Sequence, residues 1–150
     1  MAFSPLCQLN GGCMGCCGNN YISAKFVARA IKDNTREFRA VNSFSESDLL
    51  KFRDRASATS LRHGVCRNLI DRDGKLLCPL HPVLNKGKDL RIGHCDVEYF
   101  CQTALKFAHW DTRKQEDFVT FIQKKKLDNI NYSLKMVEGE LLREFEKDRV

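Results

Sequence analysis

Eight cysteines are the residues of this 150-residue sequence with the most chemistry available to them. Cysteine thiolates bind zinc and iron, form disulfides and act as nucleophiles. The spacing of the cysteines must therefore indicate which of these uses applies. The cysteines fall into two groups along the chain. The first group is Cys7, Cys13, Cys16 and Cys17, and the second is Cys66, Cys78, Cys95 and Cys101.

The first group lies in a glycine-rich segment, residues 1–20. In the step from Cys13 to Cys16, two intervening residues let both sulfurs converge on one ion, and the neighbouring glycines allow the turns that this needs. Adjacent Cys16 and Cys17 are harder to direct at the same ion, because successive side chains diverge on most backbones. The segment therefore predicts a loop that wraps a metal, with one of the adjacent pair free to serve a second centre.

The second group is spread over a longer stretch. Two short strands on either side of the turn 71–74 form a predicted hairpin, which brings Cys66 near Cys78. Burial as a small apolar residue remains the alternative to metal binding for this group. His81 and His94 neighbour cysteines, so each is either a further ligand or a loop histidine making ordinary hydrogen bonds.

Two motifs carry a resemblance to a known family. They are Gly12-Cys13-Met-Gly-Cys16-Cys17-Gly18 and Gly74-Lys-Leu-Leu-Cys78-Pro-Leu-His81-Pro82, the second followed by Arg91 and Cys95. The chain thereby resembles the cysteine-cluster proteins with a Cys-x-x-Cys-x-x-Cys-Cys signature, described as zinc or iron chelators and also as iron–sulfur-cluster-containing proteins. Asn10 stands where that signature has its first cysteine, so Cys7 would take its place. The resemblance implies metal or cluster binding.

Apolar residues at steps of three and four predict the elements that position the cysteines. The predicted helices span residues 21–39, 44–59, 96–110, 113–126 and 133–147, and the predicted strands lie within 65–70 and 75–78. Ser43 with Glu46 forms a capping-box pattern, and Asp96 is the predicted N-cap of the third helix. Cys101 would then lie on the core side of that helix.

These elements predict a mostly α fold, with a helical body, a short β-hairpin and a metal-stapled Cys/Gly-rich N-terminal loop. The length suits a single domain, residues 1–150. Within it, residues 1–110 form the cysteine-bearing metal-binding part, and residues 111–150 form a helical hairpin that packs against it. A partner-binding role for that hairpin is the alternative.

Charge and hydropathy favour a globular protein in a reducing compartment. The net charge of +6 is scattered within residues 1–110 rather than gathered into a basic face, which argues against nucleic acid as a partner. Metal-bound thiolates carry negative charge, so an excess of positive charge near them fits metal binding. No stretch approaches the roughly 20 apolar residues of a membrane span, and no signal peptide is evident, so we expect a cytoplasmic protein.

The sequence thus predicts a protein that holds zinc or an iron–sulfur cluster through all eight cysteines. The role of the centre would be structural, metal handling or electron transfer. One alternative is a redox or transfer enzyme that uses an open metal position or a reactive cysteine, although Cys13 and Cys16 do not begin the βαβ unit in which such redox motifs usually lie. The other is an interaction adaptor with a zinc-stapled fold.

Overall fold

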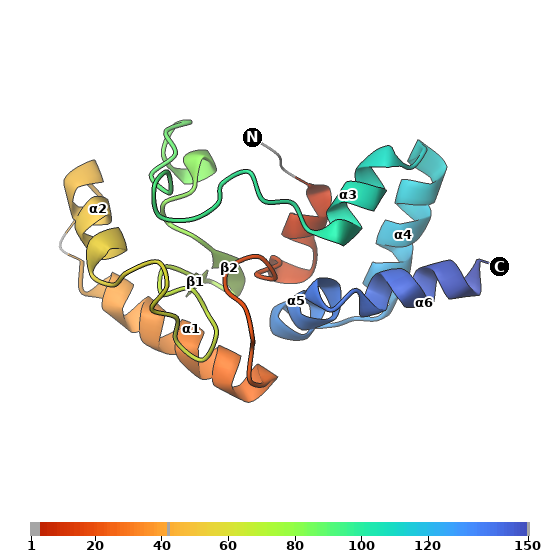
Figure 1. The fold of residues 1–150 in the computed structure, drawn as a ribbon, viewed down its shortest axis with the longest axis horizontal. Helices are drawn as coiled ribbons and strands as arrows, with labels where there is room; N and C mark the ends of the chain where they lie inside the picture. The colour runs from red at the N-terminus through yellow and green to blue at the C-terminus, as the bar shows by residue number, and fades with distance from the viewer. Residues whose placement is uncertain (1–3, 42, 150) are drawn as a thin grey trace. The chain divides into compact units, whose positions relative to one another are not determined.

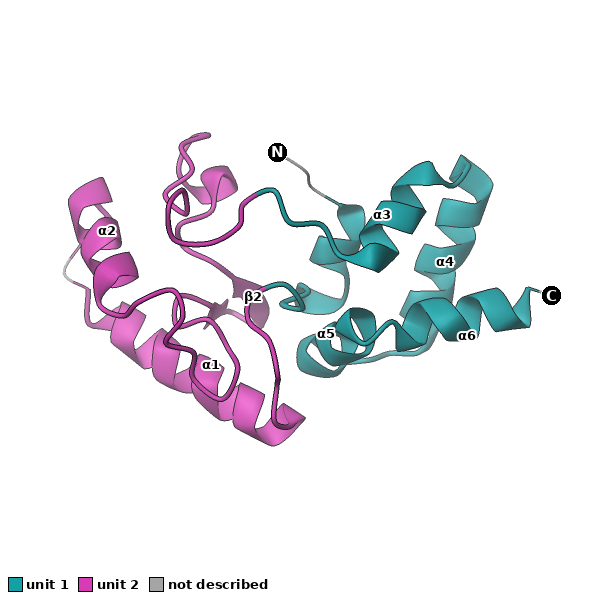
Figure 2. Cartoon of the chain, in the orientation of Figure 1, with its two compact units in different colours: residues 1–16, 98–150 teal, residues 17–97 magenta. Residues whose placement is uncertain are grey.

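The computed structural model describes residues 4–41 and 43–149 of the chain. It is mostly helical with one two-stranded antiparallel hairpin among the described residues, which confirms the predicted fold class. Its contacts divide the chain into two compact units, coloured separately in Figure 2. Unit 1 combines Met1–Cys16 with Glu98–Val150, and unit 2 is Cys17–Val97. That the whole chain forms a single domain stays a prediction.

Unit 1 joins an N-terminal 3-10 segment to the C-terminal helices (Figure 1). Its elements are η1 (Pro5–Gly11), α3 (Gln102–His109), α4 (Thr112–Lys124), α5 (Asn129–Val137) and α6 (Glu140–Asp148). The side chains of Asp111 and Asp128 cap α4 and α5 by accepting hydrogen bonds from backbone N–H groups in the first turn. Both α4 and α5 contact η1 and α6, so the N-terminal segment is part of the helical packing.

The core of unit 1 is rich in aromatic side chains. Its buried members are Leu6, Phe107, Phe118, Ile122, Tyr132, Met136, Leu141 and Phe145. The Tyr132 hydroxyl donates a 2.6 Å hydrogen bond to the carbonyl oxygen of Leu6. A buried phenol needs such a partner, and this one ties η1 to α5 inside the core.

Unit 2 surrounds a short hairpin with two helices and a second 3-10 turn. Its elements are α1 (Ala24–Arg39), α2 (Glu46–Asp54), β1 (Ile70–Arg72), β2 (Lys75–Leu77) and η2 (Pro82–Leu84). The register pairs Ile70 with Leu77 and Arg72 with Lys75, and the Asp71 carboxylate accepts a hydrogen bond from the Gly74 N–H across the turn. Helix α1 packs against β1.

A buried asparagine on α1 organises the segment that carries Cys66. Asn34 is fully buried, and its Nδ2 donates 2.9 Å hydrogen bonds to the carbonyl oxygens of Cys66 and Leu69. Its Oδ1 accepts a hydrogen bond from Arg62 at 2.9 Å. The two donated hydrogen bonds therefore fix the backbone before the hairpin, and the accepted one holds the Arg62 side chain.

Glu37, one turn further along α1, predicts how unit 2 responds to acid. Hydrogen bonds from Arg62 and Arg55 lower the pKa of its carboxyl to about 2. A pKa below the unfolded value stabilises the fold above pH of about 4.5, and this stabilisation is lost as the pH falls toward 2. The side chain is 38% exposed, so solvent screening reduces the contribution to about 1 kcal/mol.

We therefore expect Glu37→Gln to lower the free energy of unfolding by about 1 kcal/mol at pH 6 and to have little effect at pH 2. Urea unfolding at the two pH values measures the difference. Glu116→Gln, at an exposed position on α4, is the matched control. An equal loss at both pH values would show that the Glu37 charge makes no net contribution.

Two predicted helix starts were wrong. Helix α3 begins at Gln102, so Cys101 is its N-cap instead of lying inside a helix that starts near Asp96. The Cys101 sulfur accepts from the Ala104 N–H, a role that Asp96 was predicted to play. Helix α2 begins at Glu46 with Ser45 as its N-cap, because the Ser45 hydroxyl reaches the Asp48 N–H.

The predicted helix 133–147 is in fact two helices. Gly139 adopts a left-handed backbone, φ 74°, which separates α5 from α6 and which glycine adopts without the steric penalty of a side chain. The first strand is also shorter than predicted, because residues 65–69 make turns and an isolated bridge instead. Among the described residues, no helix is both long enough and apolar enough to cross a bilayer.

Candidate metal centres

The eight cysteines are all described, and none is in a disulfide. Each unit contains four of them. Unit 1 holds Cys7, Cys13, Cys16 and Cys101, and unit 2 holds Cys17, Cys66, Cys78 and Cys95. The units therefore differ from the two sequence groups at two cysteines. Cys17 lies in the unit of the second group, and Cys101 lies in the unit of the first.

In unit 1 the cysteine loop closes on itself and lies against the core. The Cys13 N–H donates to the Cys7 carbonyl at 2.9 Å, and Cys13 packs against the core cluster. Burial, together with negative charge on Cys7 and Cys16, raises the pKa of the Cys13 thiol to about 12. Burial also raises the pKa of Cys7, to which charge on Cys16 and Cys101 adds. The four sulfurs therefore lie close enough to act on one another.

Backbone amides donate to two of these sulfurs. The Gly15 N–H points to Cys13 Sγ at 3.4 Å, and the Ala104 N–H points to Cys101 Sγ at 3.4 Å. Hydrogen bonds of this kind stabilise the thiolate form and lower the pKa of a thiol. Burial outweighs them here, so a cation would be needed to hold these cysteines as thiolates at neutral pH.

Helix α5 supports the residues between Cys13 and Cys16. The Met14 N–H donates to the buried Ser133 hydroxyl at 2.9 Å, and that hydroxyl donates to the Asn129 carbonyl at 2.7 Å. A Cβ at Gly15 would lie 3.1 Å from the Cβ of Val137, so the loop runs close to the helix. The Cys-x-x-Cys step is thus held in place by hydrogen bonding and packing.

In unit 2 Cys78 packs against a buried cluster of Leu49, Leu80 and Leu90. Burial raises the pKa of its thiol to about 12, a backbone hydrogen bond from Leu80 opposes the shift, and negative charge on Cys66 and Cys95 adds to it. This charge effect agrees with the expectation that Cys66 lies near Cys78, which stays a prediction. The Cys66 N–H donates to the Cys17 carbonyl at 2.8 Å, which joins the fourth cysteine to the same region.

The donor set of each unit fits a metal, although the side chains need to turn toward it. Among the described residues, no three His, Cys, Asp or Glu side chains already converge on one ion. Rotation about a Cα–Cβ bond carries a sulfur between staggered positions, and convergence on an ion would need such rotations. Four thiols match a closed zinc site and also the usual ligand count of an iron–sulfur cluster.

The N-terminal loop also contains a buried donor for which no acceptor is found. Asn10 Nδ2, between Cys7 and Cys13 in the chain, is buried and lacks a hydrogen-bond partner in the described part of the protein. Leaving such a group unmet costs about 1–3 kcal/mol, so native proteins rarely do so. A thiolate or cluster sulfide held by this loop would offer the anionic acceptor that the amide lacks.

The histidines near the cysteines make loop hydrogen bonds. His81 Nδ1 accepts from the Val83 N–H at 3.1 Å and caps η2, and His94 Nε2 lies 3.1 Å from Asn68 Nδ2. These are the bonds predicted as the alternative to metal ligation. His63 packs its ring on Phe26 at 4.9 Å between centroids.

Sequence reasoning missed Tyr132 and Ser133. Both are fully buried on α5, and each bonds to the backbone of the N-terminal segment. Burial raises the pKa of Tyr132, and negative charge on Cys13 and Cys7 adds to the shift, so its hydroxyl lies near those sulfurs. Neither residue stands out in the sequence, since a tyrosine and a serine near a helix start are ordinary there.

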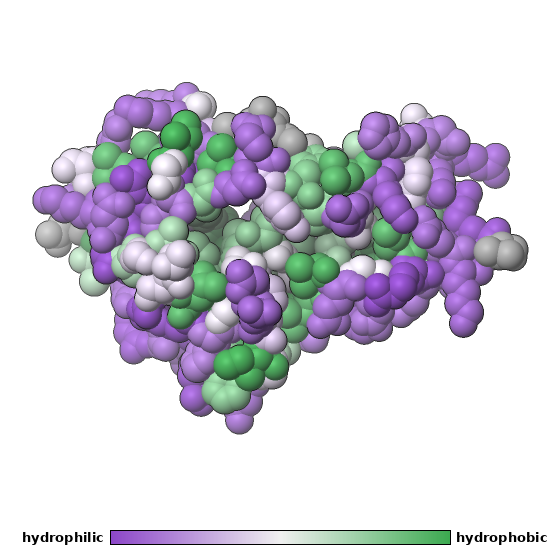
Figure 3. Space-filling view, in the orientation of Figure 1, coloured by the Kyte–Doolittle hydropathy of each residue, from purple (hydrophilic) through white to green (hydrophobic). Residues whose placement is uncertain are grey.

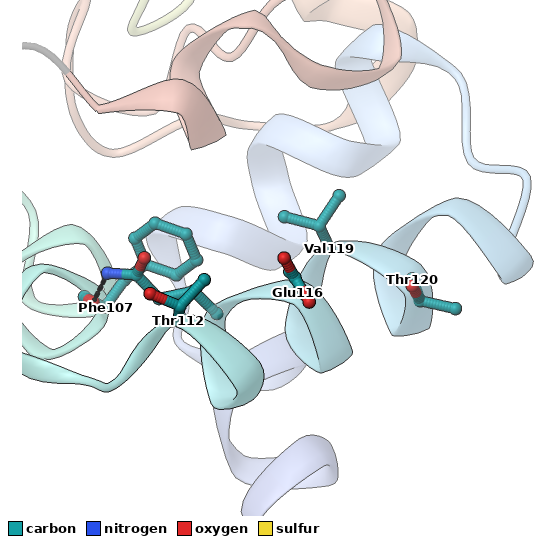
Figure 4. A pocket seen from close by; sticks show the side chains of 6 residues that line it. Phe107, Thr112, Glu116, Val119 and Thr120 are labelled. Carbon is teal, nitrogen blue, oxygen red and sulfur yellow. Dashed lines mark hydrogen bonds between the residues drawn. The ribbon is translucent and has the colours of Figure 1, made fainter.

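A separate hollow lies beside α4 in unit 1 (Figure 4). Its lining side chains are Phe107, Thr112, Gln115, Glu116, Val119 and Thr120. Gln115 Nε2 donates to the Phe107 carbonyl at 2.7 Å. The lining offers hydrogen-bonding groups and one carboxylate but no thiol or imidazole, so this hollow is distinct from the cysteine clusters.

Comparison with protein-family profiles, with curated proteins and with solved structures returned no match. The resemblance to cysteine-cluster proteins stays a prediction from the motifs. Function has therefore to be inferred from the geometry and chemistry of the chain itself.

Proposed function

We propose that this protein binds zinc or an iron–sulfur cluster through its cysteines, as the cysteine-cluster proteins that it resembles are described to do. One observation carries the proposal. Cys7, Cys13 and Cys16 gather with Cys101, which is distant in sequence, around sulfurs that receive backbone hydrogen bonds. A metal site requires thiols from distant segments in one compact unit, and rotation of these side chains would complete the approach to an ion.

The energetics of the N-terminal segment support the same function. Ordering a residue costs about 1–2 kcal/mol of backbone entropy, and glycine-rich segments lose more than average. Leu6 and Met14 bury their side chains, but most of residues 7–20 are exposed or only partly buried. A metal bound to thiolates adds binding energy of about 10–16 kcal/mol in small zinc modules, enough to stabilise such a segment.

The centre would be structural, serve metal handling or transfer electrons, in a reducing compartment such as the cytoplasm. The thiol form of all eight cysteines is what that compartment maintains. Figure 3 shows hydrophilic side chains interspersed with apolar ones over the face in view. Zinc leaves a protein colourless, whereas an iron–sulfur cluster gives it a brown colour and acid-labile sulfide.

We expect protein purified without oxygen to carry zinc, or iron with sulfide, and Cys13→Ser or Cys101→Ser to lose the metal of unit 1. Each variant removes one of four ligands and leaves the remaining thiols unable to close a site. Elemental analysis with sulfide determination measures the content. His63→Ser and His109→Ser are controls that should retain full metal content.

Two results would contradict these expectations. If the wild-type chain carries only trace zinc and iron, and if all eight thiols react freely with a thiol reagent, the protein is not a metal-binding protein. Unchanged metal in both cysteine variants would show that any bound metal lies outside unit 1.

A further inference from the structure

We propose that the chain builds two separate metal centres, and that the adjacent residues Cys16 and Cys17 serve different ones. The first centre has the ligands Cys7, Cys13, Cys16 and Cys101, and the second has the ligands Cys17, Cys66, Cys78 and Cys95. This inference rests on the proposed function and adds the assignment of each thiol. Neither set borrows a ligand from the other unit.

The backbone on either side of the Cys16–Cys17 peptide bond has different partners. Ahead of it, Met14 and Gly15 are held on α5 by the Ser133 hydroxyl and by packing on Val137. After it, the backbone pairs with the segment before the hairpin. The Cys17 carbonyl accepts from the Cys66 N–H at 2.8 Å, Gly18 forms an antiparallel bridge with Val65, and the Asn19 N–H donates to the Gly64 carbonyl at 2.9 Å.

These contacts decide between one shared centre and two. Side chains of successive residues in extended or turn backbone point in different directions, so one ion reaches both sulfurs only with difficulty. Here the backbone before Cys16 is held on α5, and the backbone at Cys17 is bonded to the segment that carries Cys66. Zinc takes four ligands, and the division at this peptide bond leaves two complete sets of four with no thiol unused.

Two further segments of unit 2, those with Cys66 and Cys95, approach the segment that carries Cys78. Cys66 lies in the turn before β1, where its carbonyl accepts from the Leu69 N–H at 3.2 Å, and Cys78 directly follows the last residue of β2. The Leu90 N–H donates to the Leu80 carbonyl at 3.1 Å, which brings the segment with Cys95 back beside the one with Cys78. The turn is completed by the Cys95 N–H, which donates to the Arg91 carbonyl at 3.3 Å.

A positive charge stands beside these thiols. The Arg91 guanidinium lies within electrostatic range of Cys95 and Cys78. Its orientation is fixed by the Asp89 carboxylate, 2.8 Å from Nη2, whose side chain is 3% exposed. A fixed cation near Cys78 and Cys95 would offset part of the net charge of about −2 that four thiolates leave on a divalent ion.

The test removes one ligand from one centre at a time and measures whether Cys16 or Cys17 becomes reactive. The full chain is loaded with zinc under reducing conditions without oxygen, and its zinc content is measured. Zinc-loaded wild type, Cys101→Ser and Cys78→Ser are then treated with iodoacetamide, and labelling of each cysteine is followed by mass spectrometry. Fragmentation of the peptide separates Cys16 from Cys17.

We expect Cys101→Ser to increase labelling of Cys16 at least about tenfold while Cys17 stays protected, and Cys78→Ser to do the reverse. Each variant should retain about half of the wild-type zinc. Fluorescence of Trp110, the one tryptophan of the sequence, checks that unit 1 remains folded in Cys101→Ser. Should it unfold, Cys7→Ser, at an exposed position of the same set, replaces it with the same expected result.

The outcomes separate this inference from the proposed function. Wild-type protein without bound zinc and with eight reactive thiols would overturn both. Zinc-loaded protein in which Cys16 and Cys17 become reactive together in either variant would overturn the two-centre assignment alone and indicate one shared centre. Continued protection of Cys17 in Cys78→Ser, with full zinc retained, would likewise overturn the second ligand set.

Discussion

Tyr132→Ala is expected to lower the free energy of unfolding of unit 1 by about 4–6 kcal/mol. Replacing a fully buried aromatic side chain by alanine costs about 3–5 kcal/mol, and the Leu6 carbonyl loses its 2.6 Å partner, which adds about 1 kcal/mol or more. Domains of this size have a total of about 5–15 kcal/mol. Much of the fold of unit 1 would be lost at physiological temperature.

Trp110 provides the measurement, because its ring packs on Phe118 and Phe145 in the unit 1 core, at 5.4 and 5.6 Å between centroids. Urea unfolding followed by its fluorescence reports the stability of that core. Tyr132→Phe retains the ring and should cost only about 1–2 kcal/mol, the contribution of the hydroxyl. Tyr99→Ala, at a half-exposed position in the same unit, should change stability little. Equal losses for Tyr132→Ala and Tyr99→Ala would contradict the packing described here.

Gly18→Ala is expected to disrupt unit 2 where it begins, at a cost of about 2–6 kcal/mol. A Cβ at this position would lie 1.9 Å from the Gly64 carbonyl oxygen, a backbone atom that cannot move without breaking the bridge between Gly18 and Val65. The backbone φ of +138° adds strain for any residue with a side chain. Since Cys17 adjoins this position, zinc binding by unit 2 should weaken with it.

Gly93→Ala is the matched control for Gly18→Ala. Gly93 also has a positive φ, +84°, but a Cβ there would meet no atom within 4 Å. It should therefore cost only the conformational penalty of about 1–2 kcal/mol. Hydrogen exchange of α1 and the hairpin compares the two variants, and similar exchange in both would show that the contact with Gly64 can relax without loss of structure.

The helical class of this protein could be predicted from its sequence, because apolar spacing records which face of each helix is buried. The helix over 21–39 and the one over 113–126 were predicted to within three residues at each end. The helix ends that were predicted at the wrong residue depend on single hydrogen bonds. Ser43 and Ser45 are equally good N-caps by residue type, and only the backbone decides that Ser45 takes the role.

The grouping of the cysteines could not be predicted in the same way. Cys101 falls on the apolar spacing of the predicted helix 96–110, yet it caps α3 and joins sulfurs from the start of the chain. Cys17 follows Cys16 directly, yet its carbonyl pairs with Cys66. Both assignments depend on contacts between residues far apart in sequence, which local periodicity does not record. The polar support from α5 was missed for the same reason.

Unit 1 is built from two separate stretches of the chain, and this affects the order in which the protein folds during synthesis. The hydrogen bond between Tyr132 and Leu6 spans 126 residues, and the one between Met14 and Ser133 spans 119. Chains fold as they leave the ribosome, and contacts between distant residues form late. Unit 2 is continuous, so all its cysteines are translated before the C-terminal helices of unit 1. We expect Cys7, Cys13 and Cys16 to remain outside a folded unit 1 until those helices have formed. Under the proposed function, unit 1 would then bind its metal only after the chain is released.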